Sequence, residues 1–322
     1  MCNKHQVISK NIAADFLPKR PDVSHKYNFG HVLIVGGCKY YPGAPVLAAE
    51  AALRVGSGLV SLAVPECIYD AVVPRISCEV VIKPLSYTSN GSISIKAIDE
   101  LLDYIVKRKV NTICIGCGLG REEETKTFLN SFLKIILSYH SNLPKEIDII
   151  IDADGFNLLE TEGKVIKVFK NKTQNVILTP HTGEYKNLLK IPDEEFEKLT
   201  KNSDYCKESE EFAKINNVVL VLKSSVVTIS DGEYIFKTNT PNSALAKGGS
   251  GDVLAGIIAG VVHQVKNYNK TVINYSHLIK AAVLGVYLHQ QSAIIGKLKK
   301  TEFCFKPTDI FEFLSEVIKE IK

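Results

Sequence analysis

The sequence predicts an α/β fold with a mostly parallel central sheet and helices on both faces. Three observations predict it. Short, nearly continuous apolar runs recur along the chain, helical apolar patterns separate them, and glycine or polar residues follow directly after most runs. Continuous apolar runs are typical of strands covered on both faces, as in parallel sheets. In open sheets of this kind, ligands bind beyond the carboxyl ends of the strands, where these glycine and polar residues fall.

The first elements in the chain are a strand, a helix and a second strand. His31 to Gly36 is an apolar run that ends in glycines, and it predicts the first strand. Small alanines between Val46 and Val55 favour a helix that packs closely on a sheet. The run from Leu59 to Val64, closed by Pro65, predicts the next strand. We therefore expect neighbouring parallel strands joined by a helix.

The same rhythm continues to the end of the chain. Further strands are expected at 112–115, 147–151, 176–178 and 218–222, and helices at 122–137 and from about 252 onward. The runs 226–229 and 233–236 flank Asp231-Gly232, a dipeptide typical of a hairpin turn. The charged region 192–211 is interpreted as a pair of surface helices, and we expect one α/β domain. Polar residues after these strands include Asp152 and Asp154.

Composition bounds the class of protein. Of the 322 residues, 45% are hydrophobic and 23% are charged, which excludes a disordered chain. The 39 basic and 35 acidic residues give a net charge of +4. This balance is too dispersed to indicate nucleic-acid binding. No apolar run reaches the roughly 18 residues of a membrane span, and the first 25 residues show no secretory signal. We expect a cytoplasmic protein without a membrane or nucleic-acid partner.

Eight cysteines are spread along the chain, and only Cys114 and Cys117 form a C-x-x-C pair. No second pair completes a zinc set. We interpret Cys114 and Cys117 as reduced thiols at the end of a buried strand. A redox role is the alternative.

The most specific local feature is the segment Lys247-Gly248-Gly249-Ser250-Gly251-Asp252, which leads into an apolar helix. Amides at a helix N-terminus and the helix dipole favour an anion, and glycines let the backbone approach it. Asp252 has two interpretations. It is either an ordinary carboxylate of a first helical turn or a base that takes a proton from a hydroxyl attacking a phosphoryl group.

One common phosphate motif is excluded and a second is only weakly matched. The chain has no G-x-x-x-x-G-K-[ST] segment, so it is not a P-loop protein. Gly116-Cys117-Gly118-Leu119-Gly120-Arg121 carries Arg121 where the third glycine of a dinucleotide fingerprint belongs.

Several motifs stand in a characteristic order. They are Gly30–Gly37, Tyr41–Ala44, Ala51–Val60, Val64–Glu66, Ile115–Gly120, Asp152–Leu159, Leu178–Glu184 and the glycine loop before Asp252. This series resembles the ADP/ATP-dependent NAD(P)H-hydrate dehydratases, a branch of the ribokinase-like superfamily. The resemblance implies a ribokinase-like domain at 26–322 after an N-terminal extension at 1–25.

The resemblance also implies an activity, which is repair of damaged nicotinamide cofactor. Such enzymes use ADP or ATP and Mg²⁺ to phosphorylate the C6 hydroxyl of the S epimer of hydrated NADH or NADPH. Phosphate then leaves and NAD(P)H is restored, so a kinase-like fold acts as a hydro-lyase. The single-domain form favours ADP.

Residue roles follow from the same resemblance. It implies that Asp252 is the catalytic base, and that Asp252, Ala44, Gly118 and His181 contact the hydrated dinucleotide. Glu184 would hold Mg²⁺ through a water molecule. The residues that match the nucleotide cradle are Lys223, Ser224, Ser225, Val226, Val227, Gly249, Ser250 and Gly251.

Some positions depart from the family pattern or stay open. Ser224 stands where a glycine is common, and Val227 where a threonine is common, which bears on nucleotide affinity. Asp152, Asp154 and Asn157 either form a turn or support substrate or metal.

Partners and competing activities also follow. Bacterial relatives are often fused to an N-terminal epimerase domain. Only about 25 residues precede the first matching segment, so we expect a separate epimerase to convert the R epimer. Relatives often form symmetric oligomers, which leaves a homo-oligomer open. The competing hypotheses are a ribokinase-like kinase of a small-molecule hydroxyl and a non-catalytic nucleotide-binding or regulatory protein.

Overall fold

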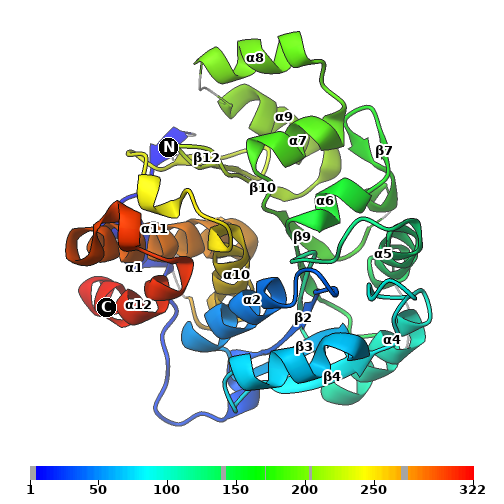
Figure 1. Cartoon of the computed structure of the whole chain (residues 1–322). Coiled ribbons are helices and arrows are strands. Elements are labelled where there is room, and N and C mark those ends of the chain that lie inside the picture. The colour runs from blue at the N-terminus through cyan, green and yellow to red at the C-terminus, as the bar shows by residue number, and fades with distance from the viewer. Residues whose placement is uncertain (1–4, 139–142, 171, 203–204, 270–274) are drawn as a thin grey trace.

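The computed structural model describes residues 5–138, 143–170, 172–202, 205–269 and 275–322. Within them a ten-stranded sheet runs in the order β1-β12-β11-β10-β9-β6-β5-β2-β3-β4 (Figure 1). All neighbours pair in parallel except β11, which is antiparallel to β10 and β12. The strands are β1 His5–Val7, β2 His31–Val35, β3 Leu59–Pro65, β4 Val81–Leu85, β5 Thr112–Ile115, β6 Asp148–Ile151, β9 Asn175–Leu178, β10 Val219–Leu222, β11 Thr228–Ser230 and β12 Ile235–Lys237, and β7 Thr161–Glu162 pairs separately with β8 Val165–Ile166.

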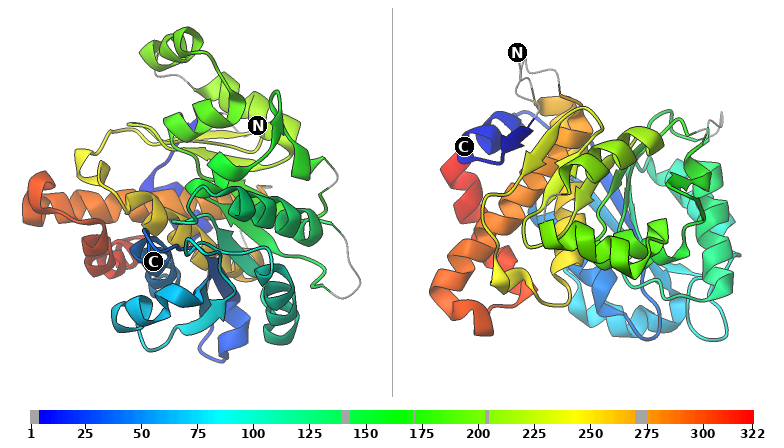
Figure 2. Two further views of the ribbon diagram at one scale, coloured as in Figure 1. Left: turned by 45° about the vertical axis from the view of Figure 1, so that its right-hand side comes forward. Right: turned by 90° about the horizontal axis from the view of Figure 1, so that it is seen from above.

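Helices cover both faces of the sheet, as predicted (Figures 1 and 2). In β2, Val32 and Ile34 join one apolar core, whereas Leu33 and Val35 join the other. Each strand is therefore apolar on both sides, which explains the continuous runs in the sequence. The first core is closed by α1 Lys10–Phe16, α2 Gly43–Arg54, α3 Tyr69–Val72, α10 Ser250–Tyr268, α11 His277–Cys304 and α12 Ile310–Ile321. The second is closed by α4 Ala97–Arg108, α5 Glu123–Ile136, α6 Asp154–Leu158, α7 Thr182–Leu189 and α9 Cys206–Asn216.

The N-terminal residues belong to the sheet and its helical layer. We placed the first strand at residue 31, but β1 pairs in parallel with β12 at the far edge. Phe16 of α1 is 1% exposed, and α1 lies beside α12 near the other end of the chain (Figure 2). Strands of three residues, such as β1, carry too short an apolar pattern to be recognised in sequence.

The charged region 192–211 contains the predicted helix pair, as α8 Asp193–Asn202 and the first part of α9. One helix, α11, has the length and apolar composition of a membrane span, but 78% of its most apolar window is buried inside the protein. Burial of this extent is typical of a core helix.

Two glycines let α10 pack directly against the backbone of α2. A Cβ placed on Gly256 would lie 2.1 Å from the Ala48 carbonyl oxygen, and one on Gly260 would lie 2.7 Å from that of Ala52. Real side-chain carbons do not approach an oxygen so closely. The helix–helix distance therefore depends on these two positions.

We expect Gly256→Ala to lower the free energy of unfolding by about 1–3 kcal/mol, because the methyl group must push α10 away from Ala48. The clash opposes the roughly 1 kcal/mol that alanine gains over glycine as a helix former. Urea denaturation measures the change. Gly43→Ala is the matched control, because no heavy atom lies within 4 Å of a Cβ at Gly43, the first residue of α2. Equal stability of Gly256→Ala and the wild type would contradict this account of the packing.

Candidate active site

A cavity of about 650 Å³ lies where the carboxyl ends of β6, β9 and β10 meet the N-terminus of α10. Its lining unites most of the residues predicted from the sequence, which are His181, Glu184, Lys223, Ser224, Ser225, Val227, Gly249, Ser250, Gly251 and Asp252. Val226, Ala44 and Gly118 are not part of this lining. The cavity is large enough for a nucleotide-sized ligand.

The glycine loop forms one wall and opens α10. Gly249 is the N-cap residue and has φ +93°, a left-handed conformation that favours glycine. Ser250, Gly251 and Asp252 form the first helical turn, so its free amides face the cavity that they line. A Cβ on Gly251 would lie 2.9 Å from Lys223 Nζ. Glycine at this position leaves an open approach for an anion next to the lysine.

His289 of α11 fixes this turn from behind. Burial lowers the pKa of its imidazole to about 4, so the ring is neutral at physiological pH. Its Nε2 lies 3.0 Å from the Ser250 carbonyl oxygen and donates to it. The histidine thus holds the start of α10 in place without adding charge.

Lys223 and Asp152 form a buried ion pair at the floor of the cavity. Lys223 Nζ lies 2.6 Å from Asp152 Oδ1, and the Asp152 side chain is 1% exposed. The Thr179 hydroxyl donates to the same oxygen at 2.7 Å. Burial alone would lower the pKa of Lys223, but the nearby carboxylates of Asp152 and Glu184 outweigh it, and the pKa is raised. The lysine is a permanent cation directly below the glycine loop.

Asp252 has the environment of a base that works near neutral pH. Burial and the charge of Asp152 raise the pKa of Asp252 to about 7, against a hydrogen bond with Cys117 and the charge of Lys223. A carboxyl with this pKa takes a proton more readily than an ordinary aspartate. Asp252 also lines the cavity. An ordinary helix-capping carboxylate has neither a raised pKa nor a position on a cavity wall.

His181 and Glu184 form a reciprocal cap at the start of α7. The imidazole Nδ1 accepts hydrogen bonds from the amides of Gly183 and Glu184, at 3.0 and 3.1 Å, and Glu184 Oε2 accepts one from the His181 amide. Burial and the charge of Asp152 raise the pKa of Glu184 to about 7, although Lys223 opposes the shift. The His181 side chain is 58% exposed and open to a ligand.

Ala44 and Gly118 meet each other outside the cavity lining. A Cβ on Gly118 would lie 3.0 Å from that of Ala44. They lie where the strand order reverses between β2 and β5, which is the usual ligand crevice of such sheets. Cys117, the neighbour of Gly118, offers its Sγ within 4.8 Å of carboxylate oxygens of Asp152 and Asp252. Cys117 thus links the backbone at Gly118 to the Asp252 carboxyl group.

The residues after β6 divide between the two interpretations. Asp154 Oδ2 accepts a hydrogen bond from the Gly120 amide, and Oδ1 accepts one from Arg121 Nε, each at 3.1 Å. Asp154 therefore supports the glycine turn at 116–121, while Asp152 enters the cavity. Asn157 has a buried Nδ2 without a partner among the described residues.

Several contributors were missed by the sequence analysis. Cys114 and Cys117 are buried and free, as interpreted, but the hydrogen bond between Cys117 and Asp252 was not foreseen. Thr238 lines the cavity, and its hydroxyl accepts the Val227 amide, which leaves the hydroxyl proton to donate elsewhere. It brings a hydroxyl group next to Val227, the position where the family often has threonine. His289 carried no local sequence signal, because it lies in the middle of a long apolar helix.

Comparison with known proteins shows which family has this sequence and fold. A family model described as NAD(P)H-hydrate dehydratase matches residues 32–316. The chain belongs to this family. Among the relatives of this NAD(P)H-hydrate dehydratase family member, a protein of Nitrosopumilus maritimus named ADP-dependent (S)-NAD(P)H-hydrate dehydratase is 32% identical, covering 80% of this chain and 81% of that protein. A bifunctional NAD(P)H-hydrate repair enzyme of Moorella thermoacetica is also 32% identical, but the chain covers only 52% of its length. The chain thus spans about half the length of such bifunctional relatives.

Solved structures confirm the ribokinase-like fold of this family member. A ribokinase-like superfamily protein from Enterococcus faecalis superposes with a TM-score of 0.75 at 26% identity, covering 99% of this chain and 98% of that one. The ADP/ATP-dependent NAD(P)H-hydrate dehydratase of Bacillus subtilis, co-crystallised with ATP and Mg²⁺, gives a TM-score of 0.78 at 24% identity over the whole of both chains.

Proposed function

We propose that this protein restores NADH and NADPH from the S epimer of their hydrates, in a reaction that consumes ADP or ATP. The observation that carries the proposal is Asp252, a carboxyl with a pKa of about 7 in the first turn of α10, beside a glycine cradle and the Lys223 cation. The names of the relatives support the substrate class. The expected site residues, Asp252 first among them, remain proposals about this chain.

The proposed chemistry has two steps. The C6 hydroxyl oxygen attacks the terminal phosphorus, Asp252 takes the hydroxyl proton, and the nucleotide leaves with the electron pair of the broken P–O bond. The C6–O bond then breaks, phosphate leaves with its electron pair, and the neighbouring ring carbon loses a proton to form the double bond. Amides of Ser250 and Gly251 and the Lys223 cation stabilise the charge on the transferred group. Phosphorylation is needed because hydroxide is a poor leaving group.

Glu184 fits the proposed magnesium site. Burial raises the pKa of its carboxyl to about 7, the carboxyl lines the cavity, and Mg²⁺ commonly binds through waters and few carboxylates. Bound there, Mg²⁺ would neutralise phosphate charge. The Glu184 carboxylate would orient a coordinated water, and Asp152 is already neutralised by Lys223.

We propose ADP as the preferred phosphoryl donor. Two relatives covered over 81% and 92% of their length, from Nitrosopumilus maritimus and Enterococcus faecalis, are named ADP-dependent. The experiment incubates the protein with acid-hydrated NADH and Mg²⁺ plus ADP or ATP, and follows the reduced-nicotinamide absorbance and released phosphate. Recovery of the absorbance with a higher kcat/KM for ADP than for ATP supports the proposal. No recovery with either nucleotide overturns the dehydratase function, and a phosphoester that accumulates would instead indicate the small-molecule kinase.

We further propose that a separate epimerase supplies the S epimer and that both act in the cytoplasm. The bifunctional names of several relatives support an epimerase link. Adding a purified epimerase to the assay is expected to raise the recovered fraction of an epimer mixture toward completion.

We expect kcat/KM to rise between tenfold and about a hundredfold per pH unit below pH 7 and to level off above it, because Asp252 must be deprotonated to accept the hydroxyl proton and the Glu184 carboxylate contributes when it is ionised. Glu184 also has a pKa of about 7, so Glu184→Gln is the control. The variant is expected to keep the rise near pH 7 while its overall rate falls. If the rise vanished in Glu184→Gln, Glu184 rather than Asp252 would be the titrating group.

A further inference from the structure

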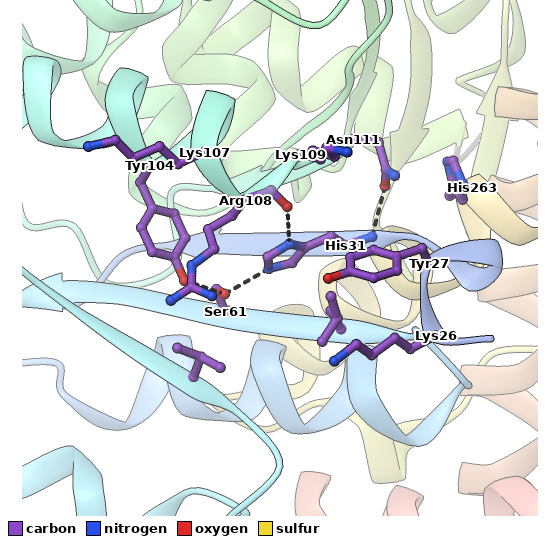
Figure 3. Close-up of a pocket in the computed structure, with 12 residues that line it drawn as sticks. Lys26, Tyr27, His31, Ser61, Tyr104, Lys107, Arg108, Lys109, Asn111 and His263 are labelled. Carbon is purple, nitrogen blue, oxygen red and sulfur yellow. Dashed lines mark hydrogen bonds between the residues drawn. The ribbon is translucent and has the colours of Figure 1, made fainter.

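A second cavity of about 720 Å³ lies at the opposite edge of the sheet, where β2, β3 and β5 begin. The Asp252 cavity lies beyond the carboxyl ends of parallel strands, so the two share no lining residue. The second cavity, which we call the basic cavity, is lined by Lys26, Tyr27, His31, Leu59, Ser61, Val81, Tyr104, Lys107, Arg108, Lys109, Asn111 and His263 (Figure 3). Nothing in the proposed reaction uses it.

The lining has one sign of charge. It contains four lysine or arginine side chains and no aspartate or glutamate, while burial lowers the pKa of its two histidines, His31 and His263. The whole chain is nearly balanced, at 39 basic and 35 acidic residues, so this concentration is local. Like charges around one concave surface raise its positive potential and attract anions.

Most of these cations lack a carboxylate partner. Among the described residues, Lys26, Arg108 and Lys109 form no ion pair, and Lys107 pairs with Asp103 at 2.8 Å. The carboxylates at this edge are engaged elsewhere, as Glu146 is with Lys266 and Asp148 is with His277. The basic cavity therefore has positive charge that the protein does not neutralise.

The cations also come from separate elements. Basic residues are common in the last turn of a helix, and Lys107 and Arg108 in α4 have that ordinary explanation. It does not cover Lys26, which precedes β2. Two distant segments therefore bring cations to one cavity, and helix capping does not require that.

A buried hydrogen-bond chain fixes the floor of the basic cavity. The His31 imidazole is 4% exposed, and its Nδ1 donates to the Arg108 carbonyl at 2.9 Å. Its Nε2 then accepts from the Ser61 hydroxyl, which accepts from Tyr104, each at 2.8 Å. Burial lowers the pKa of His31, which keeps the ring neutral as this pattern needs. This hydrogen-bond chain anchors the end of α4, so that Arg108 is held at the cavity (Figure 3).

Aromatic rings flank the cations. The Lys26 ammonium lies 5.5 Å from the Tyr27 ring centre, and the Arg108 guanidinium lies 5.7 Å from that of Tyr104. Tyr27 is 55% exposed at the rim, and Figure 3 shows its ring on the other side of His31 from Tyr104. An exposed ring beside a cation can stack on a planar base while the cation binds a phosphate.

We propose that the basic cavity binds a small molecule with two or more linked phosphates, such as a nucleoside diphosphate or free pyrophosphate, at a site separate from the catalytic one. Lys26, Arg108 and Lys109 bind the phosphates. Tyr27 provides the platform for a base when the ligand is a nucleotide. The size of the cavity fits a nucleotide, and its charge fits the polyphosphate.

Binding stoichiometry tests this proposal. Equilibrium dialysis with ADP, at low salt and without Mg²⁺, is expected to find two sites per wild-type chain. The double variant Lys26→Glu/Arg108→Glu is expected to weaken one site at least tenfold, about the effect of removing one charged hydrogen bond. Lys134→Glu is the matched control, because Lys134 is an exposed lysine in the last turn of α5, and it should keep both sites. A single ADP site in the wild type, or two unchanged sites in the double variant, would overturn the proposal.

Two further arms separate the cavities and the ligand sources. Gly251→Val fills the glycine cradle beside Lys223, and it is expected to remove the other ADP site while the basic cavity still binds. If Gly251→Val removes an ADP site but Lys26→Glu/Arg108→Glu changes none, this inference fails while the proposed function stands. If only the Lys26→Glu/Arg108→Glu variant loses a site, the proposed nucleotide cradle fails instead. Inorganic pyrophosphate is the second probe. If the basic cavity binds ADP more tightly than pyrophosphate, and Tyr27→Leu removes that difference, the ligand is a nucleotide. If ADP and pyrophosphate bind equally well, the ligand is free polyphosphate.

Discussion

Asp252→Asn is expected to reduce kcat by about 10²–10⁴-fold, the usual contribution of a general base. The amide has nearly the same shape and cannot accept the hydroxyl proton. ADP binding is expected to persist, because the cradle is formed by backbone amides and by Lys223. The measurement is the recovery of NADH absorbance from its hydrate, with ADP affinity determined in parallel. Unchanged kcat would contradict the role of Asp252.

The same variant has an expected effect on stability that separates loss of chemistry from loss of fold. The pKa of Asp252 in the folded protein is about 7, above its ordinary value of 3.8, so the fold favours the protonated carboxyl. The free energy of unfolding of the wild type should therefore fall as pH rises from about 4 to 7. Asp252→Asn lacks this pH-dependent loss, because an amide does not titrate. We expect the inactive variant to melt at a higher temperature than the wild type at pH 8, with the difference disappearing near pH 4.

Lys223→Met is expected to lower the free energy of unfolding by about 3–5 kcal/mol, because it leaves the Asp152 carboxylate buried without its partner. It should also weaken ADP binding, since Lys223 lies directly below Gly251. Urea denaturation and ADP dialysis provide the two readouts.

The double variant Lys223→Met/Asp152→Asn is the control for this prediction. Removing both charges eliminates the unpaired carboxylate, and we expect most of the stability to return while ADP binding stays weak. If the double variant were as unstable as Lys223→Met, packing of the lysine side chain rather than its charge would explain the loss.

The sequence predicted the parts of the fold that have a strong local pattern. Apolar strands such as 31–36 and 112–115, and the helix after the glycine loop, were found within a few residues. The edge pairing of β1 with β12 was not, because a three-residue strand has no distinctive period and its partner lies more than 200 residues away. The family resemblance was placed at residues 26–322, so β1 lies outside it.

The candidate site shows the same division. Motifs with glycine, such as the loop before Asp252, predicted where the backbone opens to a ligand. The pairing of Lys223 with Asp152 and the hydrogen bond from Cys117 to Asp252 depend on how separate strands align in space. No spacing in the sequence carries that information. The raised pKa of Asp252 likewise results from burial, which only the folded chain determines.

Helix α10 runs from one cavity to the other. Its first turn holds Asp252 in the proposed active-site cavity, and it reaches the basic cavity with His263, about 16 Å further along its axis at 1.5 Å per residue. Contacts with α2 through Gly256 and Gly260 bind it tightly along that length. A ligand in one cavity that shifted this helix would therefore change the shape of the other cavity as well. Any resulting change in affinity is equal in both directions, and each ligand would then report on the supply of the other.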